Sequence, residues 1–206
     1  MGTIFNELFF EKKLSAMEIA QIGQYAENVY FGKPCGLMDQ MASSVGGMVY
    51  MDFADPRQPV VEKIDFDFQA AGYDLCIIDS GADHADLTDE YAAITRELKE
   101  LCGFFHQNCL RRIPETEFMA ALPQLRKAVS DRAILRAMHI YRENQRVMAL
   151  RDALKEKDLP TFLRLITQSG HSSWMYLQNI TPAGAVQKQP VAFALGNYRQ
   201  RAHERL

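Results

Sequence analysis

Asp39 is the residue of this chain whose type and neighbourhood best suit chemistry. It lies in the first turn of a short predicted amphipathic helix, within the 33–47 stretch KPCGLMDQMASSVGG. The positive end of the helix dipole and the nearby Lys33 both favour the ionised form of such an acid. A carboxylate that stays charged at neutral pH can accept a proton or orient a hydroxyl group. The alternative is that Asp39 only stabilises the start of its helix.

Glu27 is the second acid of interest, on a helix that precedes this stretch. Ser15 and Glu18 form a capping box, which predicts the start of that helix. Its buried side is predicted from apolar residues at helical spacing, namely Ile19, Ile22, Ala26 and Val29 or Tyr30. Glu27 would lie to one side of this stripe, next to the small residues Ala20 and Gly23, which leave room for a ligand. A glutamate in such a place is otherwise simply solvated.

The elements around these acids predict an α+β fold in which helices dominate. Strands are expected over residues 48–53 and 60–66, with a turn between them at 54–56. A third strand is expected over residues 73–79, where a nearly continuous apolar run predicts burial on both faces. Helices are expected over residues 1–13, 87–105, 131–157, 158–177 and from 183 onward.

Two features of the later helices allow more than one interpretation. Tyr91 lies near the start of the 87–105 helix, and periodicity alone makes it an ordinary core aromatic. The 131–157 helix bears five arginines, Arg132, Arg136, Arg142, Arg146 and Arg151. They could form a phosphate cradle. Because they spread over several turns with acids among them, they predict a solvated, salt-bridged face instead.

Composition and charge narrow the class of protein. The chain has 206 residues, of which 48% are hydrophobic and 24% charged, as in ordinary globular proteins. A net charge of −3 offers no basic surface for nucleic acid. No signal peptide and no apolar run of membrane-spanning length are visible, so we expect a cytoplasmic protein without a membrane partner. The four cysteines show no CxxC spacing, which indicates reduced thiols.

Two motifs resemble those of a known enzyme family. PCGLMDQMAS, with the preceding AQIGQYAENVYFGK, closely resembles the active-site stretch of galactokinases, which belong to the GHMP family of small-molecule kinases. The DSGADHADLTDEY run at residues 79–91 resembles a second galactokinase segment. The helical region from 143 to 179 resembles part of the family's C-terminal domain. The similarity runs almost colinearly from about residue 1 to about residue 195.

The resemblance implies a reaction and a set of site residues. The reaction would be ATP-dependent phosphorylation of galactose, or of a related sugar such as N-acetylgalactosamine, at the anomeric hydroxyl. ATP and Mg²⁺ would be the cofactors. Asp39 would be the catalytic residue, and Gly36, Asp39 and Tyr91 would contact the sugar. Glu27 would coordinate the magnesium ion, whose preferred ligands are carboxylate oxygens.

The resemblance also implies an architecture, from which this chain departs. The family's fold would be a helix-rich, two-domain GHMP-kinase-like architecture, with residues 1–66 as an incomplete N-terminal domain. Residues 67–206 would form most of the C-terminal domain, without its last strands. The family's glycine- and serine-rich phosphate loop, its Gly-Glu-His-Thr-Asp-Tyr segment and its Gly-Gly-Gly-Phe motif are not found in this sequence, so no nucleotide-binding residues are assigned.

These departures give two expectations for activity. We expect a chain truncated at both ends that shows no galactose phosphorylation by itself. The alternative is a non-catalytic remnant that binds a sugar or takes part in an interaction. In either case the exposed strand edges and apolar faces need cover, which a homo-oligomer or a complementing chain could supply.

Overall fold

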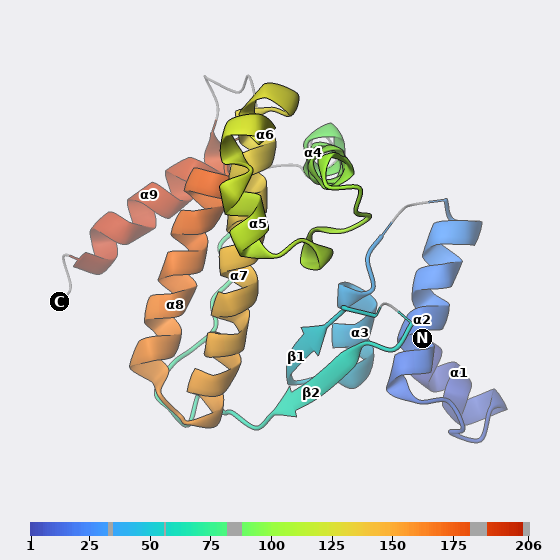
Figure 1. Cartoon of the computed structure of the whole chain (residues 1–206). Helices are drawn as coiled ribbons and strands as arrows, with labels where there is room; N and C mark the ends of the chain where they lie inside the picture. The colour runs from blue at the N-terminus through green and yellow to red at the C-terminus, as the bar shows by residue number, and fades with distance from the viewer. Residues whose placement is uncertain (33–34, 56, 82–87, 182–188, 204–206) are drawn as a thin grey trace. The chain divides into compact units, whose positions relative to one another are not determined.

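The computed structural model describes residues 1–32, 35–55, 57–81, 88–181 and 189–203. In this part of the chain, helices dominate and one small sheet is present, so the α+β class is confirmed. The chain divides into two compact units, Met1–Phe66 and Asp67–Leu206 (Figure 1). The assignment of these units to the two domains of a GHMP kinase stays a prediction. None of the described helices combines the length and apolarity needed to cross a bilayer.

The first unit contains the helices and strands around the candidate acids. Its elements are α1 (Gly2–Phe9), α2 (Ala16–Tyr25), the π-helical turn η1 (Ala26–Tyr30), α3 (Met38–Val45), β1 (Met48–Asp52) and β2 (Val60–Ile64). The predicted capping box is confirmed. The Glu18 backbone N–H donates to the Ser15 hydroxyl at 3.2 Å, and the Ser15 N–H donates to the Glu18 carboxylate at 2.8 Å. This fixes where α2 begins.

The predicted buried stripe of α2 is wrong except at Ile19, which is half-buried. Ile22, Ala26, Val29 and Tyr30 are exposed in this unit, whereas Ala20 is buried against α3. Ala20, Leu37 and Met41 form the buried cluster between the two helices. The reason is steric, because the small residues Ala20 and Gly23 let α3 approach α2 closely. A Cβ atom on Gly23 would be in van der Waals contact with the Gln40 side chain, at 3.5 Å.

The predicted strand pair is confirmed as an antiparallel hairpin. Strands β1 and β2 pair in the register Met48 with Ile64 through Asp52 with Val60. Gly46 separates α3 from β1 with φ +70° and ψ 159°, a conformation that is essentially restricted to glycine. The glycine therefore ends the helix and turns the chain into the strand.

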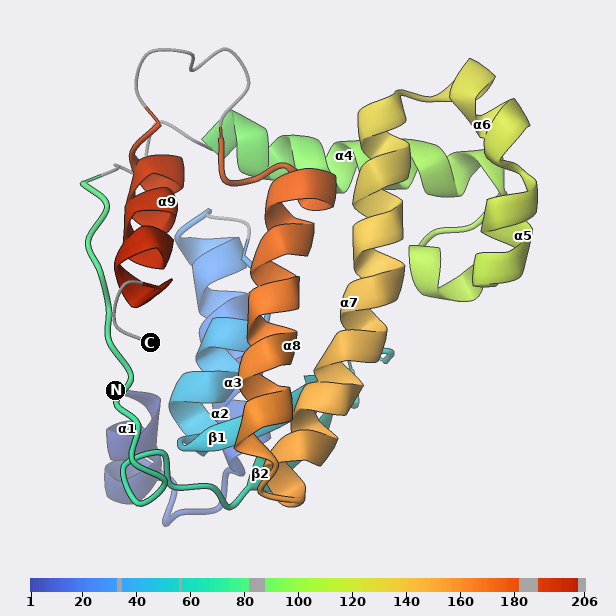
Figure 2. The ribbon, with the colours of Figure 1, turned by 90° about the vertical axis from the view of Figure 1, so that its left-hand side faces the viewer.

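The second unit is helical in its described part. Its elements are α4 (Thr88–Phe104), the 3₁₀ turn η3 (Leu110–Arg112), α5 (Glu115–Ala120), α6 (Leu122–Ala128), α7 (Asp131–Lys155), α8 (Leu159–Ser172), the π-helical turn η4 (Ser173–Leu177) and α9 (Pro190–His203). Figure 2 shows α7 and α8 side by side and α4 crossing α7 near its start. Leu101, Phe118 and Leu125 are completely buried in the main core of this unit.

The third predicted strand does not form. Residues 73–79 have no regular secondary structure, and the side chains of Leu75 and Ile77 are 92% and 95% exposed. Within the described residues the only sheet is the β1–β2 hairpin. An apolar run indicates a segment suited to burial, but a strand also needs a neighbouring strand to accept and donate its hydrogen bonds. Among the described residues, no such neighbour lies beside this segment.

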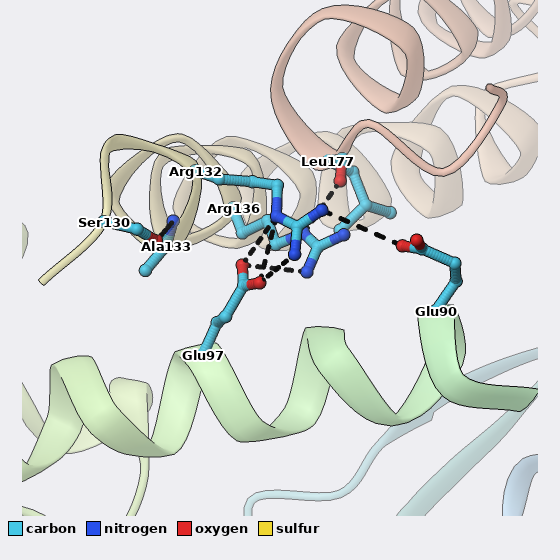
Figure 3. Close-up of polar contacts among 7 residues, drawn as sticks. All are labelled: Glu90, Glu97, Ser130, Arg132, Ala133, Arg136 and Leu177. Atoms are coloured by element: carbon cyan, nitrogen blue, oxygen red, sulfur yellow. Dashed lines mark hydrogen bonds and ion pairs between the residues drawn. The ribbon is translucent and has the colours of Figure 1, made fainter. Parts of the chain in front are cut away.

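The solvated arginine face predicted for α7 is wrong at Arg136, whose side chain is only 1% exposed. Its Nη1 donates to the Glu97 carboxylate at 2.8 Å and its Nε donates to the Leu177 carbonyl at 3.1 Å (Figure 3). Arg132 also donates to Glu97, from Nε at 2.9 Å, and its Nη1 lies 3.8 Å from the Glu90 carboxylate. Arg136 can be buried because Glu97 reaches it from α4 and supplies the opposite charge.

His139 and Ser172 form a second buried polar contact, between α7 and α8. The His139 Nδ1 lies 2.9 Å from the Ser172 hydroxyl, and both residues are buried. Burial lowers the pKa of His139. The nearby Arg146 guanidinium lowers this pKa further, and the Glu143 carboxylate raises it. The imidazole therefore stays neutral in the folded unit at a pH at which an unfolded histidine takes up a proton.

We expect the stability of the protein to fall as the pH is lowered from about 6.5, the pKa of an unperturbed histidine. Below that pH the unfolded chain binds a proton at His139 before the folded chain does, so protonation favours unfolding. Urea unfolding followed by circular dichroism at pH 7.5 and at pH 5.5 measures the change. His139→Gln should reduce the pH dependence, and the same change at the exposed His171 should leave it intact. Equal pH dependence in wild type and His139→Gln would contradict the expectation.

Candidate active site

Asp39 lies in the first turn of α3 and is exposed to solvent. No side chain caps the start of this helix, whose N-cap residue is Leu37. Asp39 is the acidic residue of the first turn, where a negative charge interacts favourably with the backbone dipole. Lys33, expected to add a positive charge, lies outside the described residues. The position of Asp39 leaves its carboxylate accessible, and its role towards a sugar stays a prediction.

Glu27 lies in the π-helical turn η1 that continues α2, and it is half-buried. Turns of this kind inside helices are frequent at functional sites. The Glu27 Oε2 accepts a hydrogen bond from the Gln40 Nε2 at 2.8 Å and lies 3.3 Å from the Cys35 Sγ. Gln40 directly follows Asp39, so these contacts tie Glu27 to the helix that carries Asp39. Coordination of magnesium by Glu27 stays a prediction.

The loop that enters α3 is held against η1 by backbone contacts of Cys35. The Cys35 N–H donates to the Asn28 Oδ1 at 2.7 Å, and its carbonyl accepts from the Asn28 and Gln24 amides at 3.3 and 3.2 Å. Gly36 comes next and is exposed, with no atom within 4 Å of the position that a Cβ would occupy. The predicted sugar-contacting glycine therefore borders open space.

Tyr91 belongs to the other compact unit, in the first turns of α4. Its side chain is 56% exposed, so its interpretation as a core aromatic is wrong. The structure thus places Glu27, Gly36 and Asp39 in the first unit and Tyr91 in the second.

Sequence reasoning missed Gln40, Cys35 and Asn28, the residues that hold this region together. One signal was available. Met17, Ala20, Gln24 and Glu27 recur at spacings of three and four, and this is the side of α2 and η1 that turns away from solvent. That spacing puts Glu27 on the side facing α3, where polar partners are needed.

The residues around Glu27 suit a hydrated divalent cation. Gln40 has a buried Oε1 atom without a hydrogen-bond partner among the described residues, and its Nε2 lies against Glu27. Carboxylate and amide oxygens are both ligands of Mg²⁺, which usually keeps several waters and binds substrate phosphates as well. The described part of the chain contains no cluster of three or more His, Cys, Asp or Glu side chains that could hold a metal alone. These described residues would therefore supply only part of the coordination.

Comparisons with known proteins agree with the motifs. Residues 1–47 match the family model described as GHMP kinases N terminal domain. Galactokinase from Actinobacillus pleuropneumoniae serotype 3 (strain JL03) is 35% identical over 159 residues, which cover 77% of this chain and 40% of that protein. Galactokinase from Haemophilus influenzae (strain PittGG) is 33% identical over 160 residues, which cover 78% of this chain and 40% of that protein.

A solved structure shares the fold. The crystal structure of Lactococcus lactis galactokinase complexed with galactose superposes with a TM-score of 0.65 at 24% sequence identity. The match covers 88% of this chain and 46% of that one. The relationship of this chain to the galactokinases of the GHMP kinase family is therefore confirmed, and the chain spans about 40% of the length of the curated galactokinases it matches.

Proposed function

We propose that this chain carries the acid and the cation-binding residue of a galactokinase-type active site. Asp39 orients the anomeric hydroxyl of galactose, or of a related sugar, and accepts its proton. Glu27 binds the magnesium ion that accompanies ATP. The observation that supports this most is the hydrogen bond between Gln40 and Glu27, because it links the helix of the exposed acid to the candidate cation ligand.

The chemistry follows from what each group does. Magnesium, when bound with ATP, neutralises charge on the phosphates during transfer. Asp39 is accessible and lies at a helix N-terminus, so its carboxylate can meet a sugar hydroxyl. Tyr91 is exposed near the start of α4 and has a phenol hydroxyl that can hydrogen-bond to a sugar. Gly36 borders open space, which allows a ligand to approach the backbone there.

We expect the chain to bind galactose and Asp39→Ala to weaken that binding about 10- to 100-fold. A hydrogen bond between a charged carboxylate and a hydroxyl contributes about 1.5–3 kcal/mol, which corresponds to a change of this size. Isothermal titration calorimetry of wild type and variant measures it. Asp65→Ala, at an exposed aspartate of the same unit, serves as the matched control and should bind like wild type.

The same preparations distinguish the alternatives. Phosphorylation of galactose by the chain alone is expected to be unmeasurable, because the sequence offers no phosphate loop to stabilise the transferring group. ADP formation that depends on galactose and clearly exceeds that of Asp39→Ala would contradict this. No galactose binding by wild type would instead favour a non-catalytic remnant that takes part in an interaction. Equal binding by wild type and Asp39→Ala would favour a sugar-binding remnant in which Asp39 has no role.

A further inference from the structure

Only one of the two polar atoms of the Gln40 side-chain amide has a hydrogen-bond partner. Its Nε2 donates to the Glu27 Oε2 at 2.8 Å and lies 3.3 Å from the Cys35 Sγ. Its Oε1 is buried and, of the buried side-chain nitrogen and oxygen atoms in the described residues, is the one that lacks a hydrogen-bond partner. Buried polar atoms in native proteins nearly always have a partner, so this oxygen indicates a missing group.

Exchanging the positions of the amide nitrogen and oxygen of Gln40 would not give every polar atom a suitable partner. In the opposite orientation Oε1 would face the Glu27 carboxylate, and two acceptors would meet with no hydrogen between them. The hydrogen bond to Glu27 therefore fixes which atom is left over. The side chain is also confined, because Gly23 lies against its Cβ and Cγ atoms.

We propose that Gln40 belongs to the cation site of Glu27. Its amide nitrogen orients the carboxylate, and its amide oxygen is a second oxygen ligand for the same hydrated divalent cation. The inference deepens the proposed function and rests on it. An amide carbonyl is a normal ligand for Mg²⁺ and Mn²⁺, and groups that orient a ligating carboxylate typically change metal affinity 10- to 100-fold when removed.

A titration of the full chain with Mn²⁺ tests this, with nuclear magnetic resonance as the readout. Bound Mn²⁺ should broaden the side-chain NH₂ signals of Gln40 and the backbone signal of Glu27 at millimolar concentration, and excess Mg²⁺ should restore them. Gln40→Met removes both polar ends and should weaken Mn²⁺ binding at least about tenfold. Gln40→Glu keeps the oxygen ligands and should bind Mn²⁺ at least as well as wild type. Gln21→Met, the same change on the neighbouring helix α2, should leave binding unaltered.

The outcomes separate the two levels of the proposal. No broadening in wild type would overturn the cation site itself, and with it the role of Gln40. Loss of binding in Glu27→Gln but not in Gln40→Met would leave the cation site intact and overturn the assignment of Gln40. Equal weakening in Gln40→Met and Gln40→Glu would show that the residue acts only as a hydrogen-bond donor, which would overturn its role as an oxygen ligand.

Discussion

Glu97→Gln is expected to lower the free energy of unfolding by about 3–5 kcal/mol. Glu97 is the acid that neutralises Arg136, which is 1% exposed. With a neutral amide in its place, the guanidinium would remain buried without an opposite charge, a change that typically destabilises a protein by this amount. The remaining contact of Arg136 with the Leu177 carbonyl does not compensate, because a carbonyl is uncharged. Urea unfolding monitored by circular dichroism measures the loss.

Two controls show whether a buried charge causes the effect. Glu90→Gln removes a more accessible acid that lies 3.8 Å from Arg132, and it should cost less than about 1 kcal/mol. The double replacement of Glu97 and Arg136 by leucine removes both charges and should recover much of the stability lost in Glu97→Gln. A double variant no more stable than Glu97→Gln would show that packing, and not the unpaired charge, determines the loss.

Sequence periodicity predicted where most helices lie, and often predicted the wrong buried face. The 87–105 and 131–157 helices are present as α4 and α7, within a few residues at each end. Their contact face, however, includes Glu97 and Arg136. A hydrophobicity pattern assigns charged residues to solvent, and it contains no information about an opposite charge 39 positions away in the chain. Ion pairs between helices therefore escape prediction from one helix alone.

The strands show a related limit. The 48–53 and 60–66 segments were predictable because a short turn joins them and makes each the partner of the other. Residues 73–79 carry a stronger apolar signal, but in the part of the chain that the structure describes no strand pairs with them. Local composition predicts that a segment is suited to burial, whereas strand pairing depends on other parts of the chain.

For the candidate site, the family resemblance predicted more residues than physical reasoning from single residues did. Asp39 in the first turn of a helix could be predicted from the proline, the glycines and the acid around it. The selection of Glu27 depended on the family resemblance, because an isolated glutamate on a helix has no distinguishing property. The contacts of Glu27 with Gln40 and Cys35 could not be predicted by either route, since they arise only when α3 packs on α2.

Met41→Ala is expected to destabilise the first unit by about 2–5 kcal/mol and to release α3 from α2. The Met41 side chain is completely buried, and the cluster it belongs to contains only Ala20 and Leu37 besides itself among the buried residues. Loss of its side chain leaves a cavity in a unit that buries little apolar surface. Small units have a low free energy of unfolding, so such a cavity removes a large part of it. Since Gln40 precedes Met41 on α3, the hydrogen bond from Gln40 to Glu27 should break when this helix detaches.

Hydrogen exchange of the α3 amides measures this release, and Met38→Ala is the matched control. Met38 lies on the same helix but is 61% exposed, so the identical truncation there should cost less than about 0.5 kcal/mol and leave exchange unchanged. Met41→Leu preserves most of the buried volume and should restore protection. Faster exchange in Met41→Ala together with loss of Mn²⁺ broadening at Glu27 would show that packing on α2 holds the cation site together. Unchanged exchange in Met41→Ala would mean that contacts other than this small core keep α3 in place.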